Sequence, residues 1–479
     1  MGHMNRNKEL AKNAAYLTIG KISTQFISFL LLPLYTSVLT MAEYGTVDLI
    51  NTYQQLLIAV LFFQIEQGIF RFIVEIRADN DTERQGGIIS SGLVISLFSA
   101  FIFTIGFVFL NNLVDSDYVI FLFTNVLAVS FSGFVLQAAR GFGDNISYVL
   151  GSFLSAVTTI IFNVILVGVM RIGPGGMLSS IFLGNVVCII VLTIRCKLYR
   201  FIRIKNISPK IIKGLLAYSL PLVPNSIAWW VISASDRTVV LYFLGASFNG
   251  LLAVSHKFST VFSSVFQIFN LSWTESASLH INDTDRSAFF SDIINKAMIF
   301  FGCICVGIIA CMPFVFSMLV NASYSKAYYQ IPLFMIGAFL NAVQGLYSVI
   351  YIGLKLTKKV AISTVAAAII NVLFGVGLVN HIGLFAAPVS TIISYFIIII
   401  YRYADLRKYV PIKLNWTKLK IFLMMMIVTL LSYYLGNVAV KALMLLAVAV
   451  LSYILNKEMI NSIIGVALKK IKRKLRRGR

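Results

Sequence analysis

The fold is decided by residues 10–71, which read LAKNAAYLTIGKISTQFISFLLLPLYTSVLTMAEYGTVDLINTYQQLLIAVLFFQIEQGIFR. This stretch holds two apolar segments, each long enough to cross the roughly 30 Å hydrocarbon core of a bilayer as a helix. Both segments carry charge inside the apolar run, Lys21 in the first and Asp48 and Glu66 in the second. Because an ionisable side chain at the bilayer centre costs about 2.5–3.5 kcal/mol on insertion scales, we expect these three to face a protein-lined or water-filled cavity.

The apolar pattern continues along the whole chain. Its 479 residues are 59% hydrophobic and 12% charged, whereas a soluble domain is about 25% charged. Apolar runs recur from end to end, and about 14 of them are long enough to span a bilayer. The sequence therefore predicts an all-α polytopic membrane protein with about 14 transmembrane helices.

The basic residues are placed asymmetrically. If the N-terminus is cytoplasmic, most of the 40 Lys and Arg residues fall on the inside, with the richest segments at 195–213, 402–420 and 469–479. Positive residues mark the cytoplasmic side, so we expect both termini in the cytoplasm and explain the net charge of +22 by topology instead of nucleic-acid binding. The basic tail is then a topology anchor or, alternatively, a segment that binds anionic lipid headgroups.

Several function classes are disfavoured by what the sequence lacks. The five cysteines and four histidines form no metal-ligand spacing, so we expect the cysteines to be packing residues. No Walker A pattern occurs, so ATP hydrolysis within this chain is not expected to drive it. The short outside loops leave no room for a catalytic domain. We expect a transporter and no enzyme, with no cofactor beyond a coupling Na⁺ or H⁺.

A weak internal repeat divides the chain. Each half begins with a basic residue, a proline in or near its first helix, and a short turn at 42–45 or 245–250. The basic loop at 195–213 separates six spans from eight. This pattern predicts two pseudo-symmetric six-helix lobes, 1–200 and 201–410, followed by two C-terminal helices and a basic tail in 411–479.

Polar residues fall on one face of four of these helices, taking 100° per residue. The second and seventh spans are each predicted as one helix, over 44–72 and 214–243, so that Glu66 returns to the direction of Asp48. The residues that we expect to line a central hydrophilic cavity are Lys21, Gln25, Asp48, Glu66, Asn225, Trp229, Asp236, Arg237 and Lys257. Arg71 points away from this stripe, and we assign it to the cytoplasmic entrance.

The cations among these residues favour an anionic cargo. Arginine presents paired donors that match phosphate, and lysine adds a point charge. The carboxylates of Asp48, Glu66 and Asp236 could neutralise the cations when the cavity is empty, or bind the coupling ion. The alternative is a buried structural ion pair, such as Asp236 with Lys257, or Glu66 with a lysine or arginine opposite. Trp229 is either a platform for a sugar or an interface aromatic.

Several motifs resemble a known family. The hairpin PLYTSVLTMAEYGTVD (33–48) resembles the first-hairpin signature of the polysaccharide flippases, the O-antigen (Wzx) type of lipid-linked oligosaccharide translocases. The motif GIFRF (68–72) resembles the end of the family's second helix, and PLVPNSIAWW (221–230) followed by Asp236-Arg237 resembles the start of its second lobe. These flippases belong to the multidrug/oligosaccharidyl-lipid/polysaccharide (MOP) exporter superfamily, together with the MATE drug exporters and the lipid II flippases.

The resemblance implies MATE-like lobes plus two further helices, a V-shaped cavity and alternating access in the bacterial inner membrane. It implies that undecaprenyl-pyrophosphate-linked oligosaccharide units cross to the periplasmic leaflet, with Lys21, Arg71, Arg237 and Lys257 holding the pyrophosphate. We expect a monomer whose partners are this glycan, membrane lipids, and the polysaccharide polymerase and chain-length machinery, with no nucleic acid. The alternatives are a MATE-like cation or drug antiporter, a lipid II-type flippase, and a membrane-embedded glycan polymerase or ligase.

Overall fold

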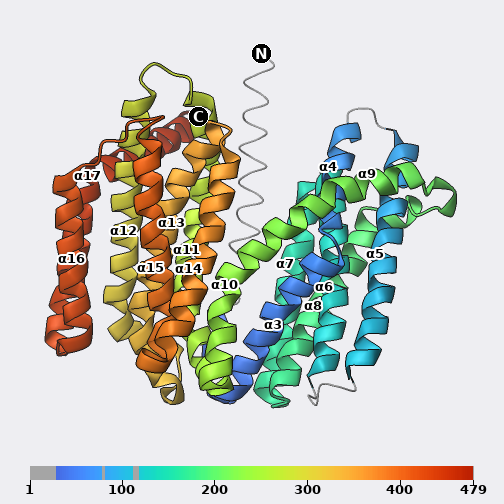
Figure 1. Ribbon diagram of the computed structural model, residues 1–479, viewed down its shortest axis with the longest axis horizontal. Helices are drawn as coiled ribbons and strands as arrows, with labels where there is room; N and C mark the ends of the chain where they lie inside the picture. The colour runs from blue at the N-terminus through green and yellow to red at the C-terminus, as the bar shows by residue number, and fades with distance from the viewer. Residues whose placement is uncertain (1–28, 78–80, 112–117, 478–479) are drawn as a thin grey trace. The chain divides into compact units, whose positions relative to one another are not determined.

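The computed structural model describes residues 29–77, 81–111 and 118–477, and this part of the chain is helical throughout (Figure 1). It forms two compact units, the first ending at Ala253 and the second beginning at Val254. The predicted lobe boundaries at 200 and 410 stay a prediction.

The first unit is built from nine helices and the start of a tenth among its described residues. They are α2 (Leu32–Val38), α3 (Met41–Leu61), α4 (Ile65–Ile76), α5 (Thr82–Asn111), α6 (Val119–Gly141), α7 (Asn145–Asn163), α8 (Pro174–Arg195), α9 (Pro209–Ser219), α10 (Val223–Leu244) and α11 (Ala246–His280). Shorter turns lie between them: the π-helix η2 (Val164–Val169) and the 3-10 turns η3 (Leu198–Arg200), η4 (Ile204–Asn206) and η5 (Leu220–Leu222).

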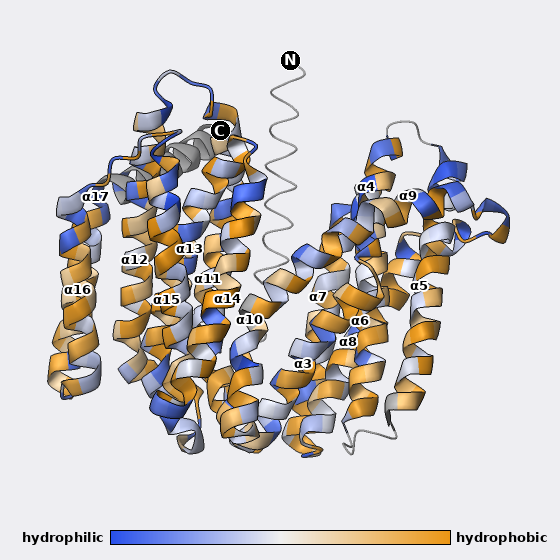
Figure 2. Cartoon of the chain, viewed as in Figure 1, coloured by the Kyte–Doolittle hydropathy of each residue, from blue (hydrophilic) through white to orange (hydrophobic). Residues whose placement is uncertain are grey.

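The second unit continues α11 and adds six long helices. These are α12 (Arg286–Leu319), α13 (Ile331–Gly353), α14 (Thr357–Ile382), α15 (Ala386–Leu406), α16 (Trp416–Leu435) and α17 (Val438–Arg477), with the 3-10 segments η6 (Ala322–Gln330) and η7 (Gly383–Phe385). Hydrophobic residues dominate the lengths of α5, α12 and α16, and hydrophilic residues gather where each of these helices begins (Figure 2).

The predicted class is confirmed. Within the described residues, ten helical stretches are long and apolar enough to cross a membrane, or eleven if the bent pair α3–α4 counts as one span. One of these stretches, Thr357–Leu406, contains both α14 and α15. The first predicted span lies largely outside the described residues. The structure is therefore compatible with about 14 spans by the length criterion.

The prediction of one continuous helix over 44–72 is wrong. The helix α3 ends at Leu61, α4 begins at Ile65, and the two are bent by 55°. Phe63 and Gln64 between them have φ of 55° and 54°, a left-handed conformation that costs a non-glycine residue about 1–3 kcal/mol. Because the helix is broken, Glu66 does not continue the face that carries Asp48.

The prediction of one continuous helix over 214–243 also needs correction. The chain forms α9, then the 3-10 turn η5, then α10. Pro221 and Pro224 lie at this break, and neither has a backbone N–H to continue the α-helical hydrogen bonds. The predicted alignment of Asn225, Trp229 and Asp236 lies entirely within α10, so it is unaffected.

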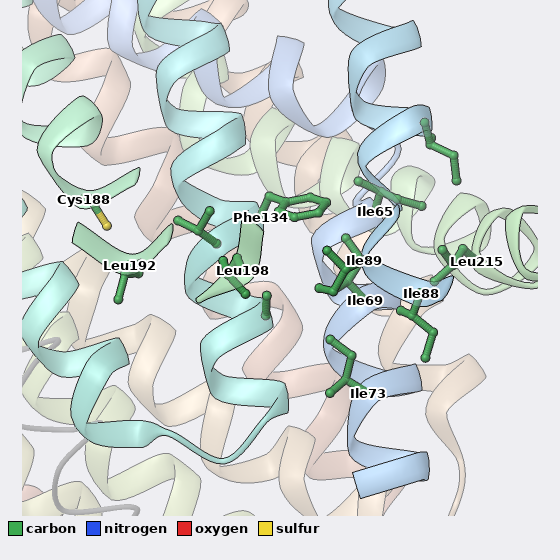
Figure 3. Close-up of a cluster of buried hydrophobic side chains, with 13 residues drawn as sticks. Ile65, Ile69, Ile73, Ile88, Ile89, Phe134, Cys188, Leu192, Leu198 and Leu215 are labelled. Carbon is green, nitrogen blue, oxygen red and sulfur yellow. The ribbon is translucent and has the colours of Figure 1, made fainter. Parts of the chain in front are cut away.

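An apolar core holds α4 in the first unit (Figure 3). Ile65, Ile69 and Ile73 repeat every four residues and so point to one side of α4, where they pack with buried side chains such as Phe134 of α6 and Leu215 of α9. These isoleucines are essentially inaccessible to solvent. The core fixes the rotation of α4 and sends Glu66, one residue after Ile65, to a different side.

Candidate functional site

The N-terminal helical turns of α3 and α11 meet beside the site. Thr40 caps α3, because its hydroxyl accepts from Glu43 N and the Glu43 carboxylate accepts from Thr40 N at 2.8 Å. A Cβ added to Gly45 would overlap the carbonyl oxygen of Ala246, and one added to Gly250 would overlap that of Met41. The two turns that the sequence predicts as repeat equivalents are thus in direct contact, and both glycines are needed for it.

An ion pair joins α3 to α10 within the first unit. Arg237 Nε donates to Asp48 Oδ2 at 2.5 Å, and the two side chains are only 13% and 19% exposed. Asn249, in the turn just described, donates to the Arg237 carbonyl at 3.1 Å. The structure therefore brings together two residues for which the sequence predicts separate roles, a substrate-binding cation and an ion-coupling acid.

Polar contacts continue along the same pair of helices. Trp230 Nε1 donates to the Thr52 carbonyl at 2.7 Å, and the Tyr53 hydroxyl lies 3.2 Å from the Thr238 hydroxyl. The Tyr53 and Trp230 rings pack at a centroid distance of 5.8 Å. Trp230 thereby anchors α10 to α3, a role that the sequence analysis did not assign.

The remaining predicted residues of α10 differ in their burial. Asp236 precedes Arg237 and is half-buried, whereas Asn225 and Trp229 are exposed. Trp229 is 47% exposed, which contrasts with the anchored Trp230 beside it. Their roles as substrate-binding and ion-coupling residues stay predictions.

Glu66 lines a separate cavity in the first unit. This cavity has a volume of about 250 Å³ and is bounded by α3, α4, α6 and α7. Its polar lining residues are Glu66, Gln67, Ser130, Gln137 and Tyr148. The side-chain oxygen of Gln137 is buried without a hydrogen-bond partner among the described residues. Glu66 makes no ion pair in the described part of the chain, so the alternative of a structural pair with an opposite lysine or arginine is not observed there.

Arg71 lies on the exposed side of α4. Its guanidinium is 3.9 Å from the Glu75 carboxylate, and both side chains are more than half exposed. An exposed pair at this distance contributes about 0–1 kcal/mol. The prediction that Arg71 turns away from the polar stripe assumed one continuous helix, which the structure does not have, so its assignment to the entrance stays a prediction.

The other predicted cations are placed differently. Lys257 belongs to the second unit and is half-buried on α11, where its neighbour His256 lies 3.2 Å from the Thr260 hydroxyl. Lys21 and Gln25 fall outside the described residues.

A buried cation that the sequence analysis missed lies in the second unit. Arg402 of α15 is 1% exposed, although the sequence suggested that it opens a basic cytoplasmic segment. Its Nε and Nη2 donate to Ser363 Oγ at 3.0 and 2.7 Å. Its Nη1 donates to the side chains of Gln344 and Ser348, and to the Gln344 carbonyl at 3.2 Å. No carboxylate contacts it among the described residues.

A second polar cluster lies one turn further along α15. Asp405 accepts from Lys359 Nζ at 2.7 Å and from the Tyr351 hydroxyl at 3.0 Å. Lys359 also donates to the Tyr409 hydroxyl at 2.9 Å. The carboxylate of Asp405, three residues after Arg402 in α15, is therefore paired with Lys359 of α14.

Solved structures share this fold. An inward-facing multidrug resistance MATE family transporter of the MOP superfamily aligns with a TM-score of 0.68 at 15% identity, covering 82% of this chain and 98% of that one. The lipid II flippase MurJ, in an inward closed conformation, aligns with a TM-score of 0.67 at 15% identity, covering 92% and 99%. An outward-facing MATE transporter reaches 0.59 at 16% identity, covering 83% and 95%. The protein is thus a multi-pass membrane protein with the fold of MOP-superfamily transporters.

The sequence identifies the family within this class. Residues 10–274, more than half of the chain, match the family described as polysaccharide biosynthesis protein, and the chain belongs to that family. Comparison with curated proteins finds no match. The predicted resemblance to the polysaccharide flippases of the MOP superfamily is confirmed at the level of family and fold.

Proposed function

We propose that this protein is a flippase that translocates undecaprenyl-pyrophosphate-linked oligosaccharide repeat units across the bacterial inner membrane by alternating access. The observation that carries the proposal is the largely buried pair of Arg237 and Asp48, in a chain of the polysaccharide biosynthesis family. An embedded guanidinium is suited to a pyrophosphate because its planar fork donates two parallel hydrogen bonds to phosphate oxygens.

The pair also suggests how binding and ion movement are coupled. Without substrate, Asp48 neutralises Arg237 at 2.5 Å. The pyrophosphate of the substrate competes with Asp48 for the guanidinium, because it carries more anionic oxygens than a carboxylate does. A carboxylate that loses its cation in a low-dielectric site must take up a proton or a metal cation. Asp48 then loads the coupling H⁺ or Na⁺ when substrate binds.

Other residues take supporting roles in this proposal. Lys21, Gln25 and Lys257 bind the lipid-linked headgroup with Arg237, and Asn225 and Trp229 contact its sugars. Arg71, which is exposed on α4, attracts the pyrophosphate at the cytoplasmic entrance. Asp236 serves as a second acid beside Arg237. The protein works as a monomer with both termini in the cytoplasm and hands its glycan to the polymerase and chain-length machinery.

A glycan-export assay tests the proposal. In cells that depend on this chain for surface polysaccharide, Arg237→Ala should abolish surface glycan at unchanged protein abundance, and Arg237→Lys should restore only part of it because lysine lacks the fork. Arg84→Ala is the matched control, since Arg84 makes an exposed pair with Asp81 at 3.8 Å on the same unit. Full surface glycan with Arg237→Ala would overturn the proposal.

A MATE-like antiporter of small cations is the second candidate. The cavity lined by Glu66 favours it, because a half-buried carboxylate with amide and hydroxyl neighbours suits a cation better than a pyrophosphate. In this case Glu66→Gln should abolish drug resistance while glycan export is unaffected. Under the flippase proposal, in which Glu66 is an ion-coupling residue, the same substitution lowers glycan export and leaves drug resistance unchanged.

A further inference from the structure

Two cavities adjoin at one end of α12, α16 and α17 in the second unit. The first has a volume of about 260 Å³, and its polar lining includes Asp292, Lys296, Asn415, Lys418 and Asn456. The second has a volume of about 400 Å³ and also reaches Asn456. Because they share this residue and are lined by consecutive positions of α12, the two cavities form one furrow between α12 and α17, polar at its mouth and apolar beyond.

The mouth of the furrow is polar, and hydrogen bonds hold its side chains in place. Asn295 ties α12 to the segment before α16, donating to the Lys413 carbonyl at 2.7 Å and accepting from Asn415 N at 2.8 Å. Lys296 Nζ is 2.8 Å from Asp292. Lys418 makes no ion pair among the described residues, so the charge of the mouth is positive overall. Lys418 also lies in the first turn of α16, whose backbone dipole favours an anion there.

The inner part of the furrow is apolar and long. Along α12 it runs from Phe300 to Cys311, which is about 17 Å at the helical rise of 1.5 Å per residue. This length is close to the roughly 15 Å depth of one leaflet of a bilayer. Gly307 leaves the furrow open, because a Cβ at that position would meet nothing within 4 Å. Val448 and Tyr453 of α17 form the opposite wall.

We propose that this furrow binds one anionic phospholipid of the surrounding membrane. The headgroup phosphate lies between the ammonium groups of Lys296 and Lys418, and one acyl chain extends along α12 past Gly307. A zwitterionic lipid such as phosphatidylcholine would bring the same phosphate, but its choline cation would lie close to the ammonium groups of Lys296 and Lys418 and be repelled, so an anionic headgroup is favoured. The bound lipid joins α16 and α17 to α12, and this role does not depend on which substrate the protein transports.

Native mass spectrometry of the purified full-length protein tests the proposal. After reconstitution with phosphatidylglycerol or phosphatidylcholine, the wild-type chain should retain one phosphatidylglycerol at least tenfold more often than one phosphatidylcholine. The double variant Lys296→Ala/Lys418→Ala should lose this preference. Lys420→Ala is the matched control, because Lys420 is an exposed residue of the same helix outside the cavity and should retain the lipid. Equal retention of both lipids by the wild-type chain, or equal loss with Lys420→Ala, would overturn the proposal.

A second measurement uses a cysteine that the chain already has in the furrow. Cys311 lines the apolar part of the furrow and is half-buried. Its alkylation by a maleimide, followed by peptide mass spectrometry, should be severalfold slower in phosphatidylglycerol vesicles than in phosphatidylcholine vesicles. Cys196, which lies in the first unit and outside the furrow, is the internal control and should react at the same rate in both. The variant Gly307→Phe should abolish the protection by filling the furrow, and identical Cys311 rates in both lipids would contradict the inference.

Discussion

Two arginines lie inside helical units of this protein, and their surroundings are opposite in kind. Arg237 faces a carboxylate, Asp48, at 2.5 Å, and both side chains keep some exposure. Arg402 is 1% exposed and is held by hydroxyl, amide and carbonyl oxygens from α13 and α14. The first cation is neutralised by a carboxylate, and the second is solvated by several neutral oxygens.

The difference separates a cation that can exchange partners from one that cannot. A carboxylate can be displaced by a competing anion or can be protonated, so the Arg237 pair is suited to a transport cycle. The Arg402 network has no such step, because several oxygens on two helices would have to leave together. Each would then be a buried polar group without a partner, at about 1–3 kcal/mol apiece. We infer that Arg402 holds α13, α14 and α15 together.

The largest expected effect comes from removing Arg402. Arg402→Met keeps much of the volume but leaves Gln344, Ser348 and Ser363 without their donor, so the free energy of unfolding should fall by about 3–5 kcal/mol. The measurement is the yield and thermal unfolding midpoint of the purified protein in detergent. Arg407→Ala is the control, since Arg407 is an exposed residue at the end of the same helix. A variant as stable as wild type would show that the neutral oxygens do not depend on this cation.

The pair of Asp48 and Arg237 should show a smaller and reversible effect on stability. Asp48→Asn or Arg237→Ala alone should lower the free energy of unfolding by about 1.5–3 kcal/mol, as for a hydrogen bond between charged groups. The exchange Asp48→Arg/Arg237→Asp should recover most of this loss, because the ion pair re-forms with its ends swapped. It should not recover glycan export, because the cation then projects from α3 instead of α10.

The outcome of the exchange distinguishes the two roles of the pair. Thermal unfolding and surface glycan are measured on the same four proteins, wild type, both single variants and the exchange. An exchange that recovers neither stability nor export would mean that the contact is not what holds α3 to α10. An exchange that recovers export as well would mean that only neutralisation of the charge matters and that Arg237 has no fixed partner in the substrate.

The sequence predicts the membrane class and the presence of embedded charges, but not their pairing. Apolar runs of about 20 residues identify the spans by themselves. Asp48 and Arg237 each stand out as a charge inside such a run, yet 189 residues separate them. Which helix faces which, and at what rotation, depends on tertiary contacts such as Gly45 against Ala246, and no local pattern encodes them.

The break between α3 and α4 and the position of Arg402 were missed for a related reason. Residues 62–64 are Phe, Phe and Gln, with no glycine or proline to signal a break. Arg402 stands at the end of an apolar run, where an arginine that reaches the membrane surface looks the same in sequence. Only the polar residues of α13 and α14, which are distant in sequence, show that it points inward.

The smallest expected effect on stability is at Arg71, which is exposed, in contrast to Arg237 and Arg402. Its contact with Glu75 is long and exposed, so Arg71→Ala should change the free energy of unfolding by less than about 1 kcal/mol. If Arg71 attracts the pyrophosphate at the entrance, surface glycan should still fall sharply, and Glu75→Ala should leave it unchanged. Arg402 would then be an embedded arginine that serves the structure alone, and Arg71 an exposed arginine that serves export alone. Arg237 would serve both purposes. Full export with Arg71→Ala would instead confine substrate binding to the embedded cations, because an exposed charge is screened over about 10 Å and adds little once the substrate has entered the bundle.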